Sequence, residues 1–325
     1  MQDASLDIAT LGGHTMGTRW SVKLATRRAR DLHPLHAGIQ AQLDRVVAQM
    51  SNWEPDSDIS RYNRGDAGSW HALPEEFFRV LETALDIARR SGGAFDPSIG
   101  PLVALWGFGA GAQAPRVPDA ATLAATARHC GWQRLQLRAS GREALQPGAL
   151  RLDLSAIAKG FGVDQVGRWL RGIGIAAALV EVGGELHGYG RKPDGQPWRV
   201  LVESGPDEDA AGDWPPRVLA LDDLAVATSG DRWHRHEIDG RRYSHTLDPR
   251  TAAPVPHAAA AVTVVARAAM DADAWATALT VMGADEGMAF ARAHGIAARF
   301  VSRGAEGVEE AISPAFQQHL DASAA

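Results

Sequence analysis

The sequence predicts an α+β fold in which mixed sheets and flanking helices form two subdomains around one cleft. Apolar residues recur at helical spacing in some segments and alternate in others, and the two kinds of segment follow one another without a fixed repeat. No low-complexity linker divides the 325 residues, which suffice for a full hydrophobic core. Hydrophobic residues make up 45% and charged residues 22%, the balance of an ordinary globular protein.

Each element is predicted from its hydrophobic spacing and from the residues, such as Pro and Gly, that mark its ends. A Pro at the start and Gly92-Gly93 at the end, for example, delimit an amphipathic helix over 74–90. Helices are predicted over residues 35–50, 74–90, 119–130, 157–170, 270–282 and 285–294. Strands are predicted over residues 22–24, 135–146, 149–155, 176–190 and 260–266, with a hairpin at 234–247 that turns at Asp239-Gly240 and a polar loop at 52–69.

Composition excludes several classes of protein. The net charge of −6 and pI of about 6.1 do not suggest a nucleic-acid partner. The single cysteine, Cys130, permits no internal disulfide. No apolar run approaches the roughly 18 residues of a membrane span, and the first ten residues have neither the charged start nor the apolar stretch of a signal peptide. We therefore expect a cytoplasmic protein or one whose leader has been removed.

The stretch 152–164, LDLSAIAKGFGVD, places Lys159 beside glycines in a chain with only three lysines. A strand that ends at Asp153, followed by a helix that opens with Ser155–Gly160, would present free N–H groups and a compact ammonium to an anion. The alternative is a Ser N-cap followed by a solvated Lys. Lys rather than Arg at this position raises the question of what it contacts.

A second pattern indicates a hard metal ion. Asp273 and Thr277 are four residues apart in a predicted helix and therefore share a face. A carboxylate and a hydroxyl suit Mg²⁺ or Ca²⁺ better than zinc. The alternative is a partly exposed Asp beside a Thr that bonds back to a helix carbonyl.

Three further stretches could carry chemistry or only structure. Residues 92–109 and 182–185 hold glycines that permit close approach of a ligand to the backbone, and also suit ordinary turns. His245 follows the predicted hairpin and could serve as a general base, with Asp248 placed to orient it, although a single His among 12 is often structural. The sequence shows no zinc-type Cys/His spacing, GxSxG motif, P-loop or Rossmann fingerprint.

Taken in order, nine stretches make the chain resemble the ApbE family. They are HTMGTRWSV, MSNWEPDSDISRYN, GGAFDPSIGPLVALWGFG, LDLSAIAKGFGVD, LVEVGGELHGYG, VATSGD, YSHTLDPRT, VTVVARAAMDADAWATAL and SPAF. No single stretch is decisive, but nine in sequence are very specific. The resemblance runs from about His14 to Phe316 and implies one ApbE-like domain over residues 14–316, with terminal segments at 1–13 and 317–325.

The resemblance to these FAD:protein FMN transferases implies a reaction. The enzyme would bind FAD and Mg²⁺ and attach FMN through a phosphoester bond to a Thr or Ser of a target protein, with release of AMP. The implied targets are flavin-carrying subunits of electron-transport complexes and related redox proteins. The implied location is the periplasmic side of the bacterial inner membrane, whereas the lack of a signal or lipoprotein Cys in this chain leaves a cytoplasmic location open.

The resemblance also implies the residues of the site. The implied FAD contacts are Met16, Trp53, Ala94, Phe95, Asp96, Asp153, Lys159 and Leu247. The implied metal ligands are the side chains of Asp273 and Thr277 and the main-chain carbonyl of Ala156, and His245 is implied in activating the acceptor hydroxyl.

Three departures from the family pattern affect these expectations. Trp53 stands where Tyr is usual, and its larger aromatic face should preserve stacking on the flavin. Ala252 replaces the Gly of PRTG, so the loop after Asp248 is expected to differ. The usual Tyr after SGD is missing as well.

Two other functions stay open at the level of sequence. A Mg²⁺-dependent FAD pyrophosphatase would use the same site with water in place of the protein hydroxyl. A flavin-binding protein without catalysis would not need the Asp273/Thr277 pair or His245, and their presence argues against it.

Overall fold

The computed structural model describes residues 6–110, 112, 115–202, 217–230, 235–238, 240–255, 259–304 and 307–320. Its centre is an eight-stranded sheet in which every neighbouring pair is antiparallel. The strands are, in spatial order, β1 (Leu6–Thr15), β2 (Thr18–Arg27), β6 (Ala178–Val182), β7 (Glu185–Tyr189), β10 (Leu224–Gly230), β15 (Ala259–Ala266), β16 (Ala297–Gly304) and β17 (Gly307–Ile312). The α+β class is confirmed. The sequence also predicted mixed sheets, which contain parallel strand pairs. In the described residues, parallel pairing is limited to the isolated bridge between Ile99 and Arg151.

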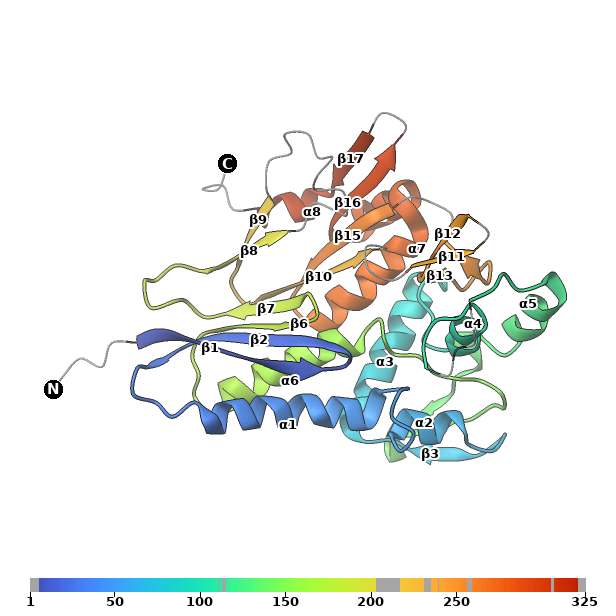
Figure 1. Cartoon of the computed structure of the whole chain (residues 1–325), viewed down its shortest axis with the longest axis horizontal. Coiled ribbons are helices and arrows are strands. Elements are labelled where there is room, and N and C mark those ends of the chain that lie inside the picture. Colours follow the sequence, from blue (N-terminus) through green and yellow to red (C-terminus); the bar gives the residue numbers. More distant parts are fainter. Residues whose placement is uncertain are drawn as a thin grey trace.

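Helices cover one face of this sheet (Figure 1). They are α1 (His33–Met50), α6 (Ala158–Gly172) and α7 (Ala269–His294), with α3 (Glu75–Arg90) packed against α1 and α7. Alternation within the strands explains the layering: Val262 and Val264 of β15 belong to the core under α7, whereas Val265 points to the opposite face. That face is covered by β8 (Trp198–Val202), β9 (Arg217–Leu221) and α8 (Pro314–Gln317).

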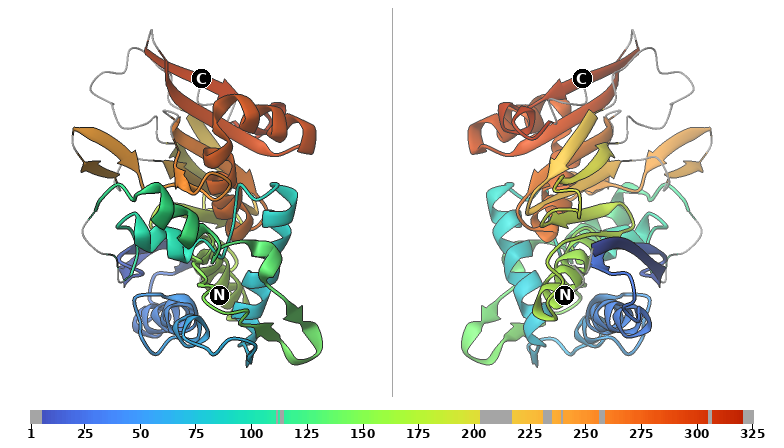
Figure 2. Two further views of the ribbon diagram at one scale, coloured as in Figure 1. Left: turned by 90° about the vertical axis from the view of Figure 1, so that its right-hand side faces the viewer. Right: turned by 90° about the vertical axis from the view of Figure 1, so that its left-hand side faces the viewer.

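A smaller group of elements continues the helical layer beyond the sheet (Figures 1 and 2). It consists of α2 (Asp58–Asn63), α4 (Gly100–Leu105), α5 (Ala120–Ala127), the 3₁₀ turns η1 (Trp132–Arg134) and η2 (Ala139–Gly141), and a sheet of β3 (Trp70–Ala72), β5 (Glu143–Leu145) and β4 (Leu137–Arg138). One hydrophobic cluster includes Ile59 of α2, Phe77 of α3 and Val262 of β15. The smaller group therefore shares a core with the main sheet.

Several predicted elements are confirmed, and their local chemistry explains them. The helix predicted over 74–90 is α3, which has Glu75 and Glu76 in its first turn and Arg89 and Arg90 in its last, as the helix dipole favours. The two helices predicted over 270–282 and 285–294 are the parts of α7 on either side of Gly283, whose φ of 80° interrupts the helix.

The predicted hairpin is formed by β11 (Arg235–Ile238) and β12 (Arg241–Ser244). The type of its turn stays untested, because Asp239 lies outside the described residues. Two shorter strands, β13 (Leu247–Asp248) and β14 (Ala253–Pro254), follow it along the chain.

Other predictions were wrong. The strand at 22–24 is part of the ten-residue β2, and its partner β1 was missed altogether. The polar loop at 52–69 contains α2, whose N-terminus is capped by the Ser57 side chain. Residues 149–155 form no regular strand, because their backbone pairs only at Arg151.

Candidate active site

The candidate site is built where α6 and α7 touch. The backbone N–H of Gly160 donates a hydrogen bond to Oδ2 of Asp273, at 3.0 Å. A Cβ at position 160 would lie only 2.2 Å from the carbonyl oxygen of Ala269, so glycine is required for this approach. At the same contact, Asp164 of α6 accepts hydrogen bonds from the N–H groups of Ala269 and Met270 and so caps α7. The two helices are thus fixed together at the first turns of each.

The contact with Asp273 diverts a hydrogen bond that would normally belong to Ala156. In a continuous helix the Gly160 N–H would bond to the Ala156 carbonyl, four residues earlier. Here α6 begins only at Ala158. The N–H groups of Ile157 and Ala158 both donate to the Leu154 carbonyl. The Ala156 carbonyl is thereby left available in the turn that precedes α6.

Thr277 follows Asp273 by one turn of regular helix, so the expectation that the two share a face is met. Thr277 is partly exposed, and no hydrogen bond of its hydroxyl is found in the described part of the chain. Thr280, three residues later, instead bonds back to the Ala276 carbonyl at 2.8 Å. The alternative of a Thr bonded to its own helix therefore describes Thr280 and not Thr277.

Lys159 pairs with a residue that the sequence did not identify. Its Nζ lies 2.5 Å from Oε1 of Glu185, the acidic residue of the VGGE stretch, whose side chain is 3% exposed. Burial lowers the pKa of Lys159, but the carboxylates of Asp273 and Glu185 outweigh that effect and hold the pKa above its ordinary value. Lys159 is thus held in an ion pair, with 33% of its side chain exposed, and no Ser caps α6, because the cap residue is Ile157 and makes no side-chain bond.

Negative charge exceeds positive charge in this buried cluster. Burial raises the pKa of Glu185, and the nearby charge of Asp273 raises it further, while Lys159 opposes both. Burial likewise raises the pKa of Asp273, against the effects of Lys159 and the Gly160 N–H. The second carboxylate oxygen of Glu185 is buried and has no hydrogen-bond partner in the described residues. A cation would relieve this imbalance.

The donor atoms suit a hard divalent ion. No group of three or more His, Cys, Asp or Glu side chains in the described ranges could hold a metal. The predicted ligand set instead combines one carboxylate, that of Asp273, with the hydroxyl of Thr277 and the carbonyl of Ala156. Mg²⁺ binds through few protein ligands of this oxygen type together with substrate phosphates. The residues that are present therefore fit Mg²⁺.

Met16 reaches the same region from the β1–β2 hairpin. Met16 and Gly17 form its two-residue turn with φ of 48° and 71°, the left-handed pair that a tight hairpin requires. The Met16 methyl lies 3.2 Å from where a Cβ of Gly162 in α6 would be. The predicted flavin contact at Met16 is thus placed against the first turns of α6, close in sequence to Lys159.

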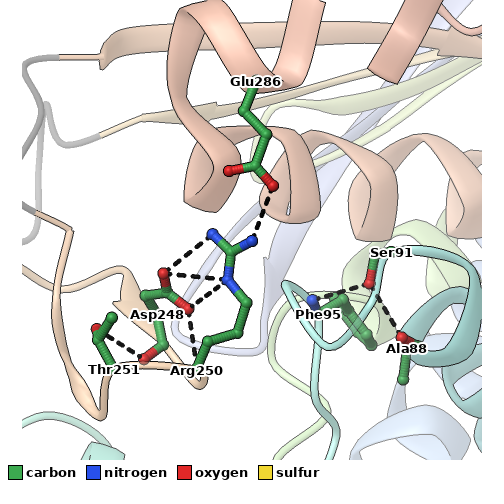
Figure 3. Close-up of polar contacts among 7 residues, drawn as sticks. All are labelled: Ala88, Ser91, Phe95, Asp248, Arg250, Thr251 and Glu286. Carbon is green, nitrogen blue, oxygen red and sulfur yellow. Dashed lines mark hydrogen bonds and ion pairs between the residues drawn. The ribbon is translucent and has the colours of Figure 1, made fainter. Parts of the chain in front are cut away.

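Ala94, Phe95 and Asp96 lie in the turn after α3, where Phe95 is bonded to Ser91 (Figure 3). The Phe95 N–H donates to the Ser91 hydroxyl at 3.1 Å, which fixes the turn to the end of the helix. The Asp96 carboxylate accepts bonds from the N–H and hydroxyl of Ser98 and from the N–H of Trp132. Burial nevertheless raises the pKa of Asp96. Asp96 therefore shapes the loop through bonds within the chain, and direct contact of these three residues with FAD stays a prediction.

Asp153 connects two of the glycine-containing stretches. Its carboxylate accepts a bond from the Ser155 N–H at 2.9 Å, and its own N–H donates to the Pro97 carbonyl at 2.8 Å. A Cβ at Gly109, in the WGFG run, would lie 4.0 Å from its other carboxylate oxygen. Asp153 does not end a strand as expected, but it lies between the 92–109 stretch and the turn that precedes α6.

Trp53 is 70% exposed, unusually so for a tryptophan. Its backbone N–H donates to the Ser51 hydroxyl at 3.3 Å. The neighbouring Asn52 amide donates to the Leu152 carbonyl at 3.1 Å and so fixes this turn beside Asp153. An exposed indole held on an anchored turn is available to cover an aromatic ligand.

His245 and Leu247 follow β12. The His245 ring lies edge-on to Phe108 of the WGFG run, with 6.5 Å between ring centroids, and Leu247 is buried in the cluster formed with Leu102 and Trp106. Asp248 was expected to orient His245, but its carboxylate binds the Arg250 guanidinium at 3.0–3.2 Å, and Arg250 also reaches Glu286 of α7 (Figure 3).

Ala252 occupies the position at which the family pattern has Gly. Its φ is 60°, in the left-handed region that favours glycine, and its N–H bonds to the Asp248 carbonyl at 2.9 Å. The turn therefore keeps a glycine-like conformation despite the substitution, at a strain of about 1–2 kcal/mol.

Sequence reasoning missed the pairing of Glu185 with Lys159 and the contact of Gly160 with Asp273. Glu185 belongs to the stretch 182–185, which was singled out only for its glycines. The signal that could have identified it is an acidic residue within a predicted, largely apolar strand. The role of Gly160 carried no local signal, because its partner Asp273 is 113 residues away along the chain.

Comparison with known proteins shows the family of the chain. The model of the ApbE family matches residues 16–300. The chain belongs to the ApbE family.

Relatives within the family align along nearly the whole chain. The FAD:protein FMN transferase of Klebsiella pneumoniae is 35% identical over 314 residues, with 95% of this chain and 89% of the relative covered. The same-named protein of Vibrio cholerae is 36% identical over 311 residues, covering 95% and 92%. The apo crystal structure of the flavinyl transferase ApbE of Pseudomonas stutzeri superposes with a TM-score of 0.89 at 37% identity and covers 98% of both chains.

No helix in the described residues is both long and apolar enough to span a lipid bilayer.

Proposed function

We propose that this chain is an FAD:protein FMN transferase. It would attach FMN through a phosphoester bond to a Thr or Ser hydroxyl of an acceptor flavoprotein and release AMP. The observation that carries the proposal is the contact between Gly160 and Asp273, which fixes the Asp273 carboxylate close enough to Lys159 to raise its pKa. Relatives named FAD:protein FMN transferase, 35–36% identical along nearly the whole chain, support it.

The reaction replaces the phosphoanhydride bond of FAD with a phosphoester bond to the acceptor. The acceptor hydroxyl oxygen attacks the phosphorus of the FMN half of FAD, and the bond between that phosphorus and the oxygen bridging to AMP breaks. The hydroxyl proton passes to His245, and the electron pair of the broken bond leaves on AMP. Little covalent help from the protein is needed, so positioning and charge stabilisation dominate.

The residues divide this work by position. Asp273, Thr277 and the Ala156 carbonyl would hold Mg²⁺, which supplies charge neutralisation for the phosphates and the leaving AMP. Trp53 would cover the isoalloxazine ring, and Met16, Leu247 and the turn at Ala94–Asp96 would bound its pocket. Glu185 orients Lys159 and limits its reach, so the ammonium serves as a fixed point charge near the phosphates. A bidentate Arg at this position would compete with the metal ion for the same phosphate oxygens.

The acceptor and the compartment follow from the same proposal. The acceptor would be a flavin-carrying subunit of an electron-transport complex or a related redox protein. The transfer would take place on the periplasmic side of the bacterial inner membrane, as the resemblance to the family implies.

One experiment separates this function from its two alternatives. The protein is incubated with FAD, Mg²⁺ and a candidate acceptor flavoprotein subunit, and both the acceptor mass and AMP release are followed. Equal amounts of modified acceptor and AMP support transfer. AMP release in excess of acceptor modification, with free FMN, would identify a pyrophosphatase. Tight FAD binding without AMP release would identify a non-catalytic flavin-binding protein.

A further inference from the structure

A pocket adjoins the α6–α7 contact through Asp164 and Met270, and none of the residues proposed to contact FAD or Mg²⁺ lines it. It has a volume of about 280 Å³ and opens where α3, α6, β7 and the start of α7 meet. Its polar lining consists of Arg79, Arg168, Arg171, Arg267, Asp164 and His187. The volume is close to the lower limit of small-ligand pockets, roughly 300 Å³.

Positive charge dominates this pocket, with four guanidiniums against one carboxylate. Arg79 and Arg171 have partners in Glu75 and Asp223. Arg168 and Arg267 have neither an ion pair nor a hydrogen bond within the described ranges. Burial lowers the pKa of Arg168, and the charge of Arg79 lowers it further, as expected where guanidiniums crowd together.

The carboxylate of the pocket is already committed to the backbone. Asp164 accepts bonds from Ala269 at 2.8 Å and from Met270 at 3.0 Å, so it balances the positive end of α7. Its charge also acts on Arg168, whose pKa it raises, and Arg168 lies over the Phe161 ring. Arg168 and Arg267, which have no ion pair within the described residues, still leave an excess of positive charge in the pocket that an anion would neutralise.

His187 adds a further polar group to the pocket. It is 8% exposed and lines the pocket, and neither ring nitrogen makes a well-formed hydrogen bond in the described residues. Its nearest acidic partners are oxygens of Asp164 and Asp223, each 3.5 Å from one nitrogen, at the outer limit of hydrogen-bond length. Buried polar groups are nearly always hydrogen-bonded, so this imidazole has room for a closer partner.

We propose that this pocket binds a phosphate dianion, presented either as free phosphate or as a small phosphate ester. Planar guanidiniums recognise phosphate oxygens through paired hydrogen bonds, and Arg168 and Arg267 approach from two different elements. The imidazole of His187 provides a further donor or acceptor for a phosphate oxygen. A dianion also matches the two guanidiniums without partners better than a single carboxylate does.

The test is a binding titration on the whole chain with FAD and Mg²⁺ present at saturation, so that the flavin site is filled. Inorganic phosphate, glycerol 3-phosphate, glycerol and succinate are titrated separately by calorimetry. The variants are the double substitution Arg168→Gln/Arg267→Gln and the single substitution His187→Phe. The matched control is Arg28→Gln/Arg138→Gln, which removes two exposed arginines elsewhere.

We expect one saturable site for at least one of the two phosphates and none for glycerol. The double variant should weaken it at least tenfold, His187→Phe should weaken it measurably, and the control should leave it unchanged. Tighter binding of glycerol 3-phosphate than of inorganic phosphate would identify an ester as the ligand. No saturable binding, equal weakening by the control, or equally tight binding of succinate would overturn the proposal.

Discussion

The N–H of Gly160 and the carboxylate of Asp273 meet at 3.0 Å, across the point where α6 and α7 come closest. This bond fixes a buried acidic side chain and removes the N–H that a regular helix would give to Ala156. One contact thus positions two candidate metal ligands. It depends on the absence of a side chain at position 160, because the backbone of Ala269 occupies the space.

The first prediction tests this packing. Gly160→Ala would place a Cβ 2.2 Å from the Ala269 carbonyl oxygen, and backbone must move to relieve the clash. We expect a loss of about 1–3 kcal/mol in the free energy of unfolding, together with weaker Mg²⁺ binding. Gly172→Ala, at the other end of α6, is the control, because a Cβ there meets nothing within 4 Å. Equal stability of the two variants in urea denaturation would refute the steric account.

The second prediction separates function from stability at Asp273. Because the fold raises the pKa of this carboxylate, its negative charge is unfavourable in the metal-free chain. Asp273→Asn keeps an oxygen for the Gly160 N–H and removes the charge. The variant should be at least as stable as the wild type without metal, while Mg²⁺ affinity and FMN transfer are lost. Calorimetric Mg²⁺ titration and thermal unfolding check this, with Asp285→Asn on the exposed part of α7 as control. Wild-type Mg²⁺ affinity would remove Asp273 from the metal site.

Elements whose pattern is local in the sequence were predicted better than elements that depend on pairing between distant residues. Helices such as α3 were predicted well, since their periodicity is local. Residues 149–155 were predicted as a strand because Leu150, Leu152 and Leu154 alternate with polar residues. All three leucines are buried, but the backbone there pairs at one residue only. Strand β1 was missed because it is an edge strand, exposed along most of its length, and so carries little apolar alternation.

In the candidate site, too, relationships set by helical spacing were predicted, whereas contacts between distant residues were not. Asp273 and Thr277 could be paired from sequence because helical spacing decides which residues share a face. The partner of Lys159 could not be predicted, because Glu185 comes from a strand 26 residues later. The expected role of Asp248 stays a prediction, and the structure adds a partner that was not expected: Arg250, two residues on, binds its carboxylate.

The third prediction concerns the buried ion pair of Lys159 and Glu185. Lys159→Met would leave the carboxylates of Glu185 and Asp273 without their cation, and we expect a loss of about 3–5 kcal/mol in stability without metal. Adding Glu185→Gln should restore much of this, since it removes one of the stranded charges. A double-mutant cycle by urea denaturation measures the coupling. Additive effects of the two substitutions would show that the pair contributes nothing specific.

The fourth prediction concerns Trp53. Its indole is 70% exposed, so Trp53→Ala should leave the unfolding free energy nearly unchanged. FAD affinity should fall by roughly 1–3 kcal/mol, the scale of base–aromatic stacking, and the quenching of bound flavin fluorescence should weaken. Trp53→Phe, which keeps an aromatic face, should lose less than Trp53→Ala. Unchanged affinity of Trp53→Ala in a fluorescence titration would show that the indole does not cover the flavin.

The fifth prediction concerns His245. A Thr or Ser hydroxyl is a weak nucleophile and must lose its proton as the bond to phosphorus forms. A positioned base contributes about 10²–10⁴-fold to such a step, so His245→Ala should slow FMN transfer by about two orders of magnitude or more. The decisive quantity is the transfer rate at saturating FAD, with FAD affinity measured separately. Unchanged affinity with a slow rate would confine His245 to activation of the acceptor.

Two controls make the His245 result specific. His294→Ala removes a histidine at the end of α7 whose ring bonds to the Phe290 carbonyl, and it should not change transfer. AMP release without acceptor reports on hydrolysis, in which water replaces the hydroxyl. If His245 serves only the acceptor hydroxyl, hydrolysis should fall much less than transfer. Because the His245 ring lies against Phe108, the substitution could also loosen the WGFG run, which reduced FAD affinity would reveal. A transfer rate within a few-fold of wild type would leave metal binding and positioning as the whole basis of catalysis.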